Sequence, residues 1–412
     1  MLLAGQILST TRHLGGSPVV RRTKIAALAV LWVAPLLLIF FGLRTNWRAT
    51  WGAVGVGVDV LPFADLRGIT GALVTLHNHG DPFTANPGDP WNRPLNSPRV
   101  WLKLFSMLGI NDSRIPFVGV TFCVFYLICV SALLVRCMHT LDALILLWAG
   151  LSFCPLLAIQ LGNTDLFIFT LMFVGCMTHS KILKPGVFFA AAILKIYPLV
   201  AMPIVAVRGS RKERGALLVL AALATATFAW QWRDLNAIRH ATPISSRMAY
   251  GVLSMKAQVE EGLDSPLGHR LPVSWIAILG CWLAGGGVVA ATWTNRTYLD
   301  ESIRMSTNGG LFLAFGAIYA FTFAIGSNWD YRLIFLLPTL PLAFDLARQS
   351  THRKWAIAYM ALVILAENPL ELISIYGAAL CQLITFFLFM IVTRFLTLLC
   401  KPDLANESIS RA

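Results

Sequence analysis

Repeated apolar runs of membrane-crossing length constrain this chain most. They lie at about 25–43, 116–135, 141–160, 165–178, 187–207, 216–231, 274–293, 309–326, 332–347, 355–366 and 376–399. Hydrophobic residues make up 57% of the chain and charged residues 13%, whereas soluble domains average about 45–50% and about 25%. Since about 20 apolar residues cross a bilayer as a helix, the sequence predicts an all-α polytopic membrane protein with about 11–12 transmembrane segments. We expect one integral membrane domain over 1–412.

The net charge of +13 is explained by membrane topology. In a soluble protein it would indicate a nucleic-acid partner, but cytoplasmic loops of membrane proteins collect Lys and Arg, so no nucleic acid is expected. Arg21, Arg22 and Lys24 precede the first run, and no small-residue cleavage pattern follows it. We therefore expect a retained first helix, both termini in the cytoplasm, and the polar chemistry on the outer face.

The eight cysteines lie in or beside apolar runs. They form no CxxC pair and no cluster with histidines. Cysteines of this kind are typical of small buried apolar residues, so neither a disulfide framework nor a zinc site is expected.

The run 187–207 is flanked by basic clusters that end at Lys184 and begin at Arg208. A single crossing would place one cluster outside the cell, against the positive-inside rule. The run also contains Lys195 and Pro198, and proline interrupts a helix. These features predict a broken hairpin of two half-length helices whose outermost point lies near Lys195, where the ammonium could meet a lipid phosphate.

The first long outer loop, about 44–115, contains two segments with helical apolar spacing, 64–77 and 98–109. Amphipathic helices beside a membrane usually lie in its interface. Asp65 stands at the start of the first of these segments, where a carboxylate either stabilises the helix end or acts as a general base for a hydroxyl. Asp59, before a turn that contains proline, is the competing base.

A short polar turn between two apolar runs carries Asn163 and Asp165. Such a turn is commonly only a loop, and Asp165 at the start of a helix is commonly only a cap. Here, however, amide and carboxylate side chains gather at one predicted mouth of the bundle. We therefore keep both residues as candidates for a polar site.

A third outward segment carries Asp330, Tyr331 and Arg332. A guanidinium can grip a phosphate through two donors, so Arg332 is a candidate for phosphate or sugar recognition. The competing interpretation is an interfacial anchor, for which Trp329 and Tyr331 would be typical. The second long outer loop, 232–273, contains no motif that assigns roles.

These residues fall into a recognisable order. An outer-loop Asp is followed by Gly80-Asp-Pro-Phe83, Gly162-Asn163-Thr-Asp165, Ala192-Ile-Leu-Lys195-Ile-Tyr-Pro198 and Tyr331-Arg-Leu-Ile-Phe-Leu-Leu-Pro338. Over roughly 60–340 the chain resembles the GT-C membrane glycosyltransferases. The pattern is closest to the family of bacterial polyprenyl-phosphate-mannose-dependent mannosyltransferases, family 87.

The resemblance implies an inverting transfer of a sugar from a polyprenyl-phosphate carrier to a hydroxyl of a glycan or glycolipid, on the outer face of the cell membrane. It assigns the role of base to Asp65, with Asp59 as the fallback. The donor phosphate and sugar fall to a group of basic and polar residues, Lys195, Tyr197, Arg332, Tyr331 and Asp330, with Arg67 and Arg93 in second rank. No cofactor is implied, and the sequence does not require a metal, although the wider superfamily allows a divalent one.

One segment departs from the family pattern. It runs from Asp89 to Arg99 through Trp91 and Arg93 and has no counterpart that we recognise in the mannosyltransferases. The identity of the sugar, mannose or another hexose or pentose, and that of the acceptor therefore stay open.

Two other classes remain as alternatives. A transporter would also have broken helices and a buried Lys, but the two related halves common in transporters are not visible here. An O-antigen polymerase or ligase would use outer-loop arginines such as Arg239 and Arg247. The discriminating feature is the acid, because a GT-C enzyme depends on one loop carboxylate.

Overall fold

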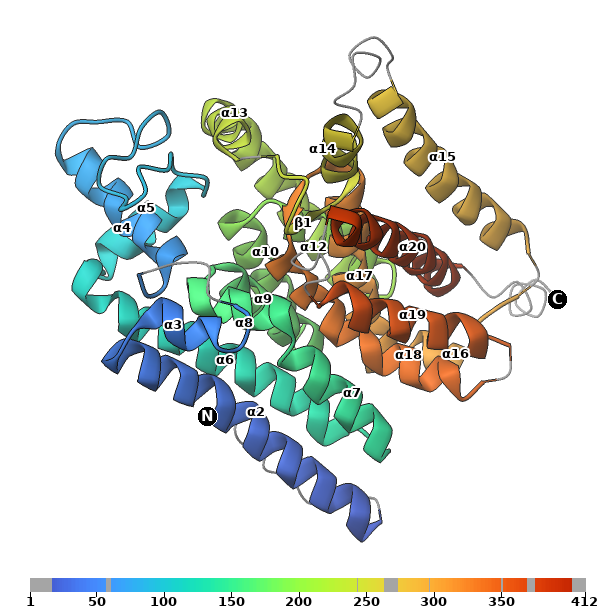
Figure 1. Ribbon diagram of the computed structural model, residues 1–412. Coiled ribbons are helices and arrows are strands. Elements are labelled where there is room, and N and C mark those ends of the chain that lie inside the picture. Colours follow the sequence, from blue (N-terminus) through green and yellow to red (C-terminus); the bar gives the residue numbers. More distant parts are fainter. Residues whose placement is uncertain are drawn as a thin grey trace. The chain divides into compact units, whose positions relative to one another are not determined.

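The computed structural model describes residues 17–56, 61–242, 244–262, 273–295, 297–349, 351–368 and 375–401. It is 77% helical, and its strands amount to one pair of two residues each among the described residues. The prediction of an all-α chain is confirmed. Figure 1 labels the helices and strands along the chain. By its internal contacts the chain forms two compact units.

Unit 1 comprises Met1–Val174, Phe189–Ile196 and Ala222–Pro243, and unit 2 the remainder. The first elements, all in unit 1, are α2 (Pro18–Arg44), α3 (Trp47–Gly52), α4 (Ala64–His77), α5 (Arg99–Met107), η2 (Asp112–Arg114), α6 (Ile115–Arg136), α7 (Thr140–Gly150) and α8 (Phe153–Leu161). Helices α9 (Asp165–Met177), α10 (Leu183–Leu194) and α12 (Arg211–Trp230) run from one unit into the other, and α13 (Trp232–Ala241) belongs to unit 1.

Unit 2 holds the other elements. They are η3 (Tyr197–Val200), α11 (Ala201–Ala206), β1 (Ala249–Tyr250), α14 (Val252–Gly262), α15 (Val273–Thr294), α16 (Glu301–Arg304), α17 (Thr307–Ile325), β2 (Asn328–Trp329), η5 (Asp330–Thr339), α18 (Leu340–Ala347), α19 (Arg353–Ala366) and α20 (Ile375–Cys400).

Six helical stretches within the described ranges are long and apolar enough to cross a membrane. They are Pro18–Arg44, Asp112–Arg136, Arg211–Trp230, Ile276–Thr294, Thr307–Ile325 and Gly377–Cys400. The pair α7 and α8, bent by 42°, makes a seventh if it counts as one span. These helices indicate a multi-pass membrane protein. They are fewer than the expected 11–12 because several apolar runs form shorter or interrupted helices, such as α9, α18 and α19.

In unit 1, α2 packs against α6 and α7, with α3 folded back on its end. Polar side chains reinforce this packing, since Lys24 Nζ donates to the carbonyl of Val135 at 3.0 Å and the Trp32 indole donates to Ser131 at 2.9 Å. Helix α4 contacts α5, α6 and α8. The segment that carries α4 and α5 therefore packs on the apolar helices α6 and α8.

In unit 2, α17 lies at the centre and contacts η5, α11 and α20. The strands β1 and β2 pair antiparallel, Ala249 with Trp329 and Tyr250 with Asn328. Gln382 of α20 donates to the carbonyl of Ala249 at 2.6 Å. Residues 249–250, from the loop in which the sequence showed no motif, are thus paired with the segment that carries Arg332.

The expected break in the run 187–207 is present. Helix α10 ends at Leu194, and a 3₁₀ turn beginning at Tyr197 precedes the short α11. Pro198 follows the break directly, in agreement with the loss of a helical donor at proline. The chain passes from unit 1 to unit 2 between Ile196 and Tyr197.

Both segments of 44–115 that were expected to be helical contain a helix. The segment 64–77 is α4, and α5 covers nearly all of 98–109. Four further α-helices, α3, α13, α14 and α16, were not foreseen, because they are short or carry mixed polar and apolar faces.

Candidate functional site

The start of α4 is fixed by an unusual residue, Phe63. Its φ of 56° and ψ of 49° lie in the left-handed region, which costs a non-glycine residue about 1–2 kcal/mol. Its N–H donates to the carbonyl of Gln160 at 3.2 Å. A Cβ added at Gly119 or Gly162 would lie 2.5 or 2.8 Å from Phe63 side-chain atoms. This close packing, with the ring fully buried, places Asp65 in the first turn of α4.

The Asp65 carboxylate joins two other segments. Its Oδ2 accepts a hydrogen bond from Asn163 Nδ2 at 2.6 Å, and its Oδ1 lies 3.5 Å from Arg93 Nη1. The side chain is 26% exposed, so the carboxylate is held in place and remains accessible. Asp65 therefore connects the start of α4 to the turn before α9 and to Arg93.

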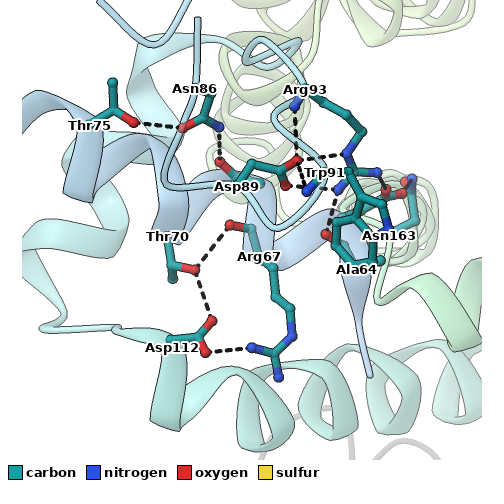
Figure 2. A network of polar contacts seen from close by, with 12 residues as sticks. Ala64, Arg67, Thr70, Thr75, Asn86, Asp89, Trp91, Arg93, Asp112 and Asn163 are labelled. Carbon is teal, nitrogen blue, oxygen red and sulfur yellow. Dashed lines mark hydrogen bonds and ion pairs between the residues drawn. The ribbon is translucent and has the colours of Figure 1, made fainter. Parts of the chain in front are cut away.

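Residues 86–93, here called the strap, lie along one face of α4. That face consists of small residues at helical spacing, Ala64, Gly68, Gly71 and Thr75. Asn86 attaches the strap to the helix: its amide donates to the carbonyl of Gly68 at 3.0 Å, and its oxygen accepts from Thr75 Oγ1 at 2.9 Å, the second contact being drawn in Figure 2. The backbones of Gly71 and Gly88 are in contact, and a Cβ on either residue would collide with the backbone at the other.

The end of the strap is organised by Asp89, whose side chain is fully buried. Its carboxylate accepts from the backbone N–H of Trp91 and of Arg93, each at 3.0 Å, and from Arg93 Nε at 3.1 Å and Nη2 at 3.0 Å. Arg93 Nη2 also donates to the carbonyl of Ala64 at 2.9 Å (Figure 2), and its guanidinium lies 4.6 Å from the centre of the Trp91 ring. The segment that departs from the family pattern is thus attached to the helix that carries Asp65.

Arg67 has a different set of partners. Its Nη1 donates to Asp112 Oδ2 at 2.5 Å and its Nε to the carbonyl of Pro62 at 2.9 Å. Thr70 Oγ1 contacts the other Asp112 oxygen at 3.5 Å, as Figure 2 shows. Arg67 therefore ties α4 to the turn before α6.

Lys195 and Asp165 form a buried ion pair. The Nζ–Oδ1 distance is 3.1 Å, and the side chains are 12% and 0% exposed. Asn163 Oδ1 accepts from the backbone N–H of Asp165 at 2.8 Å, while its amide nitrogen donates to Asp65. A continuous series of contacts therefore runs from Asp65 through Asn163 and Asp165 to Lys195.

In unit 2, Arg332 lies beside Tyr197. Its Nη1 donates to Asn328 Oδ1 at 2.7 Å, and its guanidinium is 5.5 Å from the Tyr197 ring. Asn328 is fixed in turn by the carbonyl of Thr322 at 2.7 Å. Asp330 and Tyr331, the remaining candidates of this segment, are both buried.

Three carboxylates at these contacts were missed by sequence reasoning: Asp89, Asp112 and Asp234. Asp234 of α13 binds Arg99 through two bonds, at 2.5 and 3.1 Å, and this hydrogen bonding, more than the opposing effect of burial, raises the pKa of the guanidinium. The spacing of four between Asp89 and Arg93 was the available signal for the first. The other two pair with residues far away in the sequence.

Asp59, the fallback base, lies outside the described residues. Within the described part of the chain, no group of three or more His, Cys, Asp or Glu side chains could hold a metal ion. All eight cysteines are free, and most are buried.

No protein-family model, no curated protein and no solved structure matches this chain.

Proposed function

We propose that this protein is an inverting glycosyltransferase of the outer face of the cell membrane. It would move a sugar from a polyprenyl-phosphate carrier to a hydroxyl of a glycan or glycolipid. The observation that carries the proposal is the series of contacts Asp65–Asn163–Asp165–Lys195. It joins residues from three of the motifs on which the family resemblance rests, although these motifs are far apart in the sequence.

Asp65 acts as the general base in this proposal. The acceptor oxygen forms a bond to C1 of the sugar while the bond from C1 to the phosphate oxygen breaks. The proton of the hydroxyl passes to Asp65, and the bonding electrons leave with polyprenyl phosphate. A base needs to reach the hydroxyl within hydrogen-bond distance, and the partly exposed Asp65 carboxylate, held by Asn163, is suited to this.

Lys195 is the candidate for the leaving phosphate. An ammonium group has three donors on a flexible stem, so it can keep Asp165 and turn another donor toward a phosphate. Arg332 and Tyr197 stay candidates for the donor by resemblance. The prenyl tail lies in the bilayer, where the apolar spans provide its surroundings. No nucleotide is required, because the phosphate of the carrier is the leaving group.

The decisive test replaces Asp65 with Asn in protein reconstituted in nanodiscs and supplied with polyprenyl-phosphate mannose and methyl α-mannoside. Loss of a general base lowers the rate by about 10²–10⁴, measured as release of polyprenyl phosphate. Asp112→Asn, in the same loop and more exposed, is the matched control and should stay active. Full activity in Asp65→Asn combined with Asp59→Asn would eliminate the proposed mechanism.

The same variants separate the alternatives. An enzyme of the O-antigen polymerase kind should tolerate Asp65→Asn and lose activity in Arg239→Gln or Arg247→Gln. A transporter should move substrate without releasing polyprenyl phosphate. Mass spectrometry of the lipids and glycans that disappear in a deletion strain would then identify the sugar and the acceptor.

A further inference from the structure

We propose that Arg93 is a positioning residue that orients the Asp65 carboxylate, held for this task by Asp89, and that it does not bind the donor phosphate. This inference rests on the proposed function, because it assigns a role in the same reaction. It concerns the strap, the part of the outer loop for which the family pattern gives no role.

The donors of Arg93 are directed to acceptors within the protein. A guanidinium has five N–H donors in a planar fork. Four of these donors have acceptors in this cluster: Nε donates to one Asp89 oxygen, Nη2 to the other and to the carbonyl of Ala64, and Nη1 lies 3.5 Å from Asp65 Oδ1. The group is held on the side of α4, with its remaining edge facing Asp65.

The local charge also opposes phosphate binding at Arg93. Asp65, Asp89 and Arg93 carry two negative charges and one positive charge, so the formal charge of the cluster is −1. A phosphate that drew the Arg93 guanidinium away would leave the fully buried Asp89 carboxylate without its cationic partner. Removing one member of a buried pair is strongly unfavourable. By contrast, the charges of Lys195 and Asp165 sum to zero, so this pair carries no net negative charge that would repel a phosphate.

Two side chains from different segments of the chain contact the Asp65 carboxylate. Asn163, in the turn before α9, binds Oδ2, and Arg93, on the strap, lies against Oδ1. The strap is itself fixed, because Asn86 and the Gly71–Gly88 contact attach it to α4. With one group at each oxygen, the plane of the carboxylate is defined, and a defined orientation of the base is what a proton transfer requires.

The test compares Arg93→Lys and Asp89→Asn with the wild type in the same nanodisc assay. Lys cannot reproduce the planar fork, so we expect kcat to fall by about 10–10²-fold while the KM for polyprenyl-phosphate mannose changes less than about twofold. Lys103→Gln, an exposed cation on α5, should change neither constant. Asp89→Asn should lower kcat in the same way.

Hydrogen exchange of peptides that cover 86–93 supplies a readout separate from activity. In Arg93→Lys, Asp89 still accepts the Trp91 and Arg93 amides, so the strap should exchange as in the wild type. In Asp89→Asn, which retains one acceptor oxygen, exchange should be moderately faster. A fall in kcat with an unchanged strap supports a role in orienting Asp65.

Two results would overturn the inference. One is a tenfold or larger rise in donor KM with kcat retained, which identifies Arg93 as a phosphate ligand. The other is unchanged kinetics in both variants while Asp65→Asn is inactive, which leaves the proposed function standing without this inference. Transfer that does not depend on Asp65 would instead remove the proposed function, and the inference with it.

Discussion

At the scale of single residues, most of the candidate cations of unit 1 are paired with carboxylates that lie elsewhere in the sequence. Lys195 pairs with Asp165, and Arg67 with Asp112. Pairing lets charged groups exist close to apolar helices, since an isolated charge there is very costly. The charges of these candidate cations are therefore compensated within unit 1.

Removing one member of the Lys195–Asp165 pair should cost much more stability than replacing both members. Asp165→Ala leaves a buried ammonium unpaired and should lower the free energy of unfolding by about 3–5 kcal/mol. Asp165→Leu combined with Lys195→Met should recover most of that loss. Unfolding in nanodiscs measures both variants.

The control for that experiment is Glu301→Ala, in an exposed pair with Arg304, which should cost no more than about 1 kcal/mol. Equal destabilisation by the single and double variants at Asp165 and Lys195 would show that the two charges do not stabilise one another.

His352 should make the protein sensitive to acid. It is buried, its Nδ1 has no hydrogen-bond partner, and burial lowers its pKa from the usual value. The unfolded chain therefore binds a proton at a higher pH than the folded one. The resulting stability is fully present above about pH 6.5 and falls as the pH drops through that value.

Unfolding midpoints measured between pH 8 and pH 5 test this prediction. His352→Gln should reduce the loss of stability on acidification, whereas His77→Gln, at an exposed position, should not. An unchanged pH profile in His352→Gln would assign the acid sensitivity to other groups.

At the scale of elements, the strap depends on the absence of side chains between it and α4. A Cβ at Gly71 would lie 2.5 Å from the backbone N of Asp89. The atoms that this Cβ would meet belong to the backbone of Gly88 and Asp89, so the clash can be removed only if the backbone moves. The position of Arg93 relative to Asp65 therefore depends on the close contact of Gly71 with Gly88.

Gly71→Ala should displace the strap. Overpacking of this kind costs about 1–3 kcal/mol, and we expect faster hydrogen exchange in 86–93 together with a lower kcat. Gly215→Ala, in α12 with open space around the added Cβ, is the matched control. It should stabilise the protein by about 0.5–1 kcal/mol through helix propensity. Wild-type exchange in Gly71→Ala would show that the strap tolerates the extra methyl group.

At the scale of the whole molecule, the six helices of membrane-crossing length in the described residues agree with a multi-pass membrane protein. The break near Lys195 coincides with a passage of the chain from one unit to the other. Lys195 and Pro198 therefore lie where the chain passes from unit 1 to unit 2. In our proposal, the distribution of basic residues indicates on which side of the membrane each loop lies.

Cysteine labelling tests the proposed orientation. Ser113→Cys, in the first outer loop, should react with a membrane-impermeant maleimide added to intact cells. Ser210→Cys, in the basic loop between α11 and α12, should react only after the membrane is opened. Both serines are exposed, and the unmodified protein controls for its own cysteines. Labelling of both from the outside would disprove the hairpin and the assignment of loops that depends on it.

The sequence by itself determined the helical class, the ends of α4, the presence of α5 and the break after Leu194. These features depend on local signals, namely apolar periodicity, glycine and proline in turns, and intrinsic helix preference. The short helices α3 and α13 escaped notice because their apolar residues do not form a run.

Only the tertiary structure decided which charged groups meet. Arg93 and Asp65 are 28 positions apart, and Arg99 and Asp234 are 135 apart. Nothing local in the sequence specifies such partners, because they are brought together by the packing of α4 on α6 and α8 and by the contact of two glycines. The sequence identified Asp65 as a candidate, and packing determined what holds it.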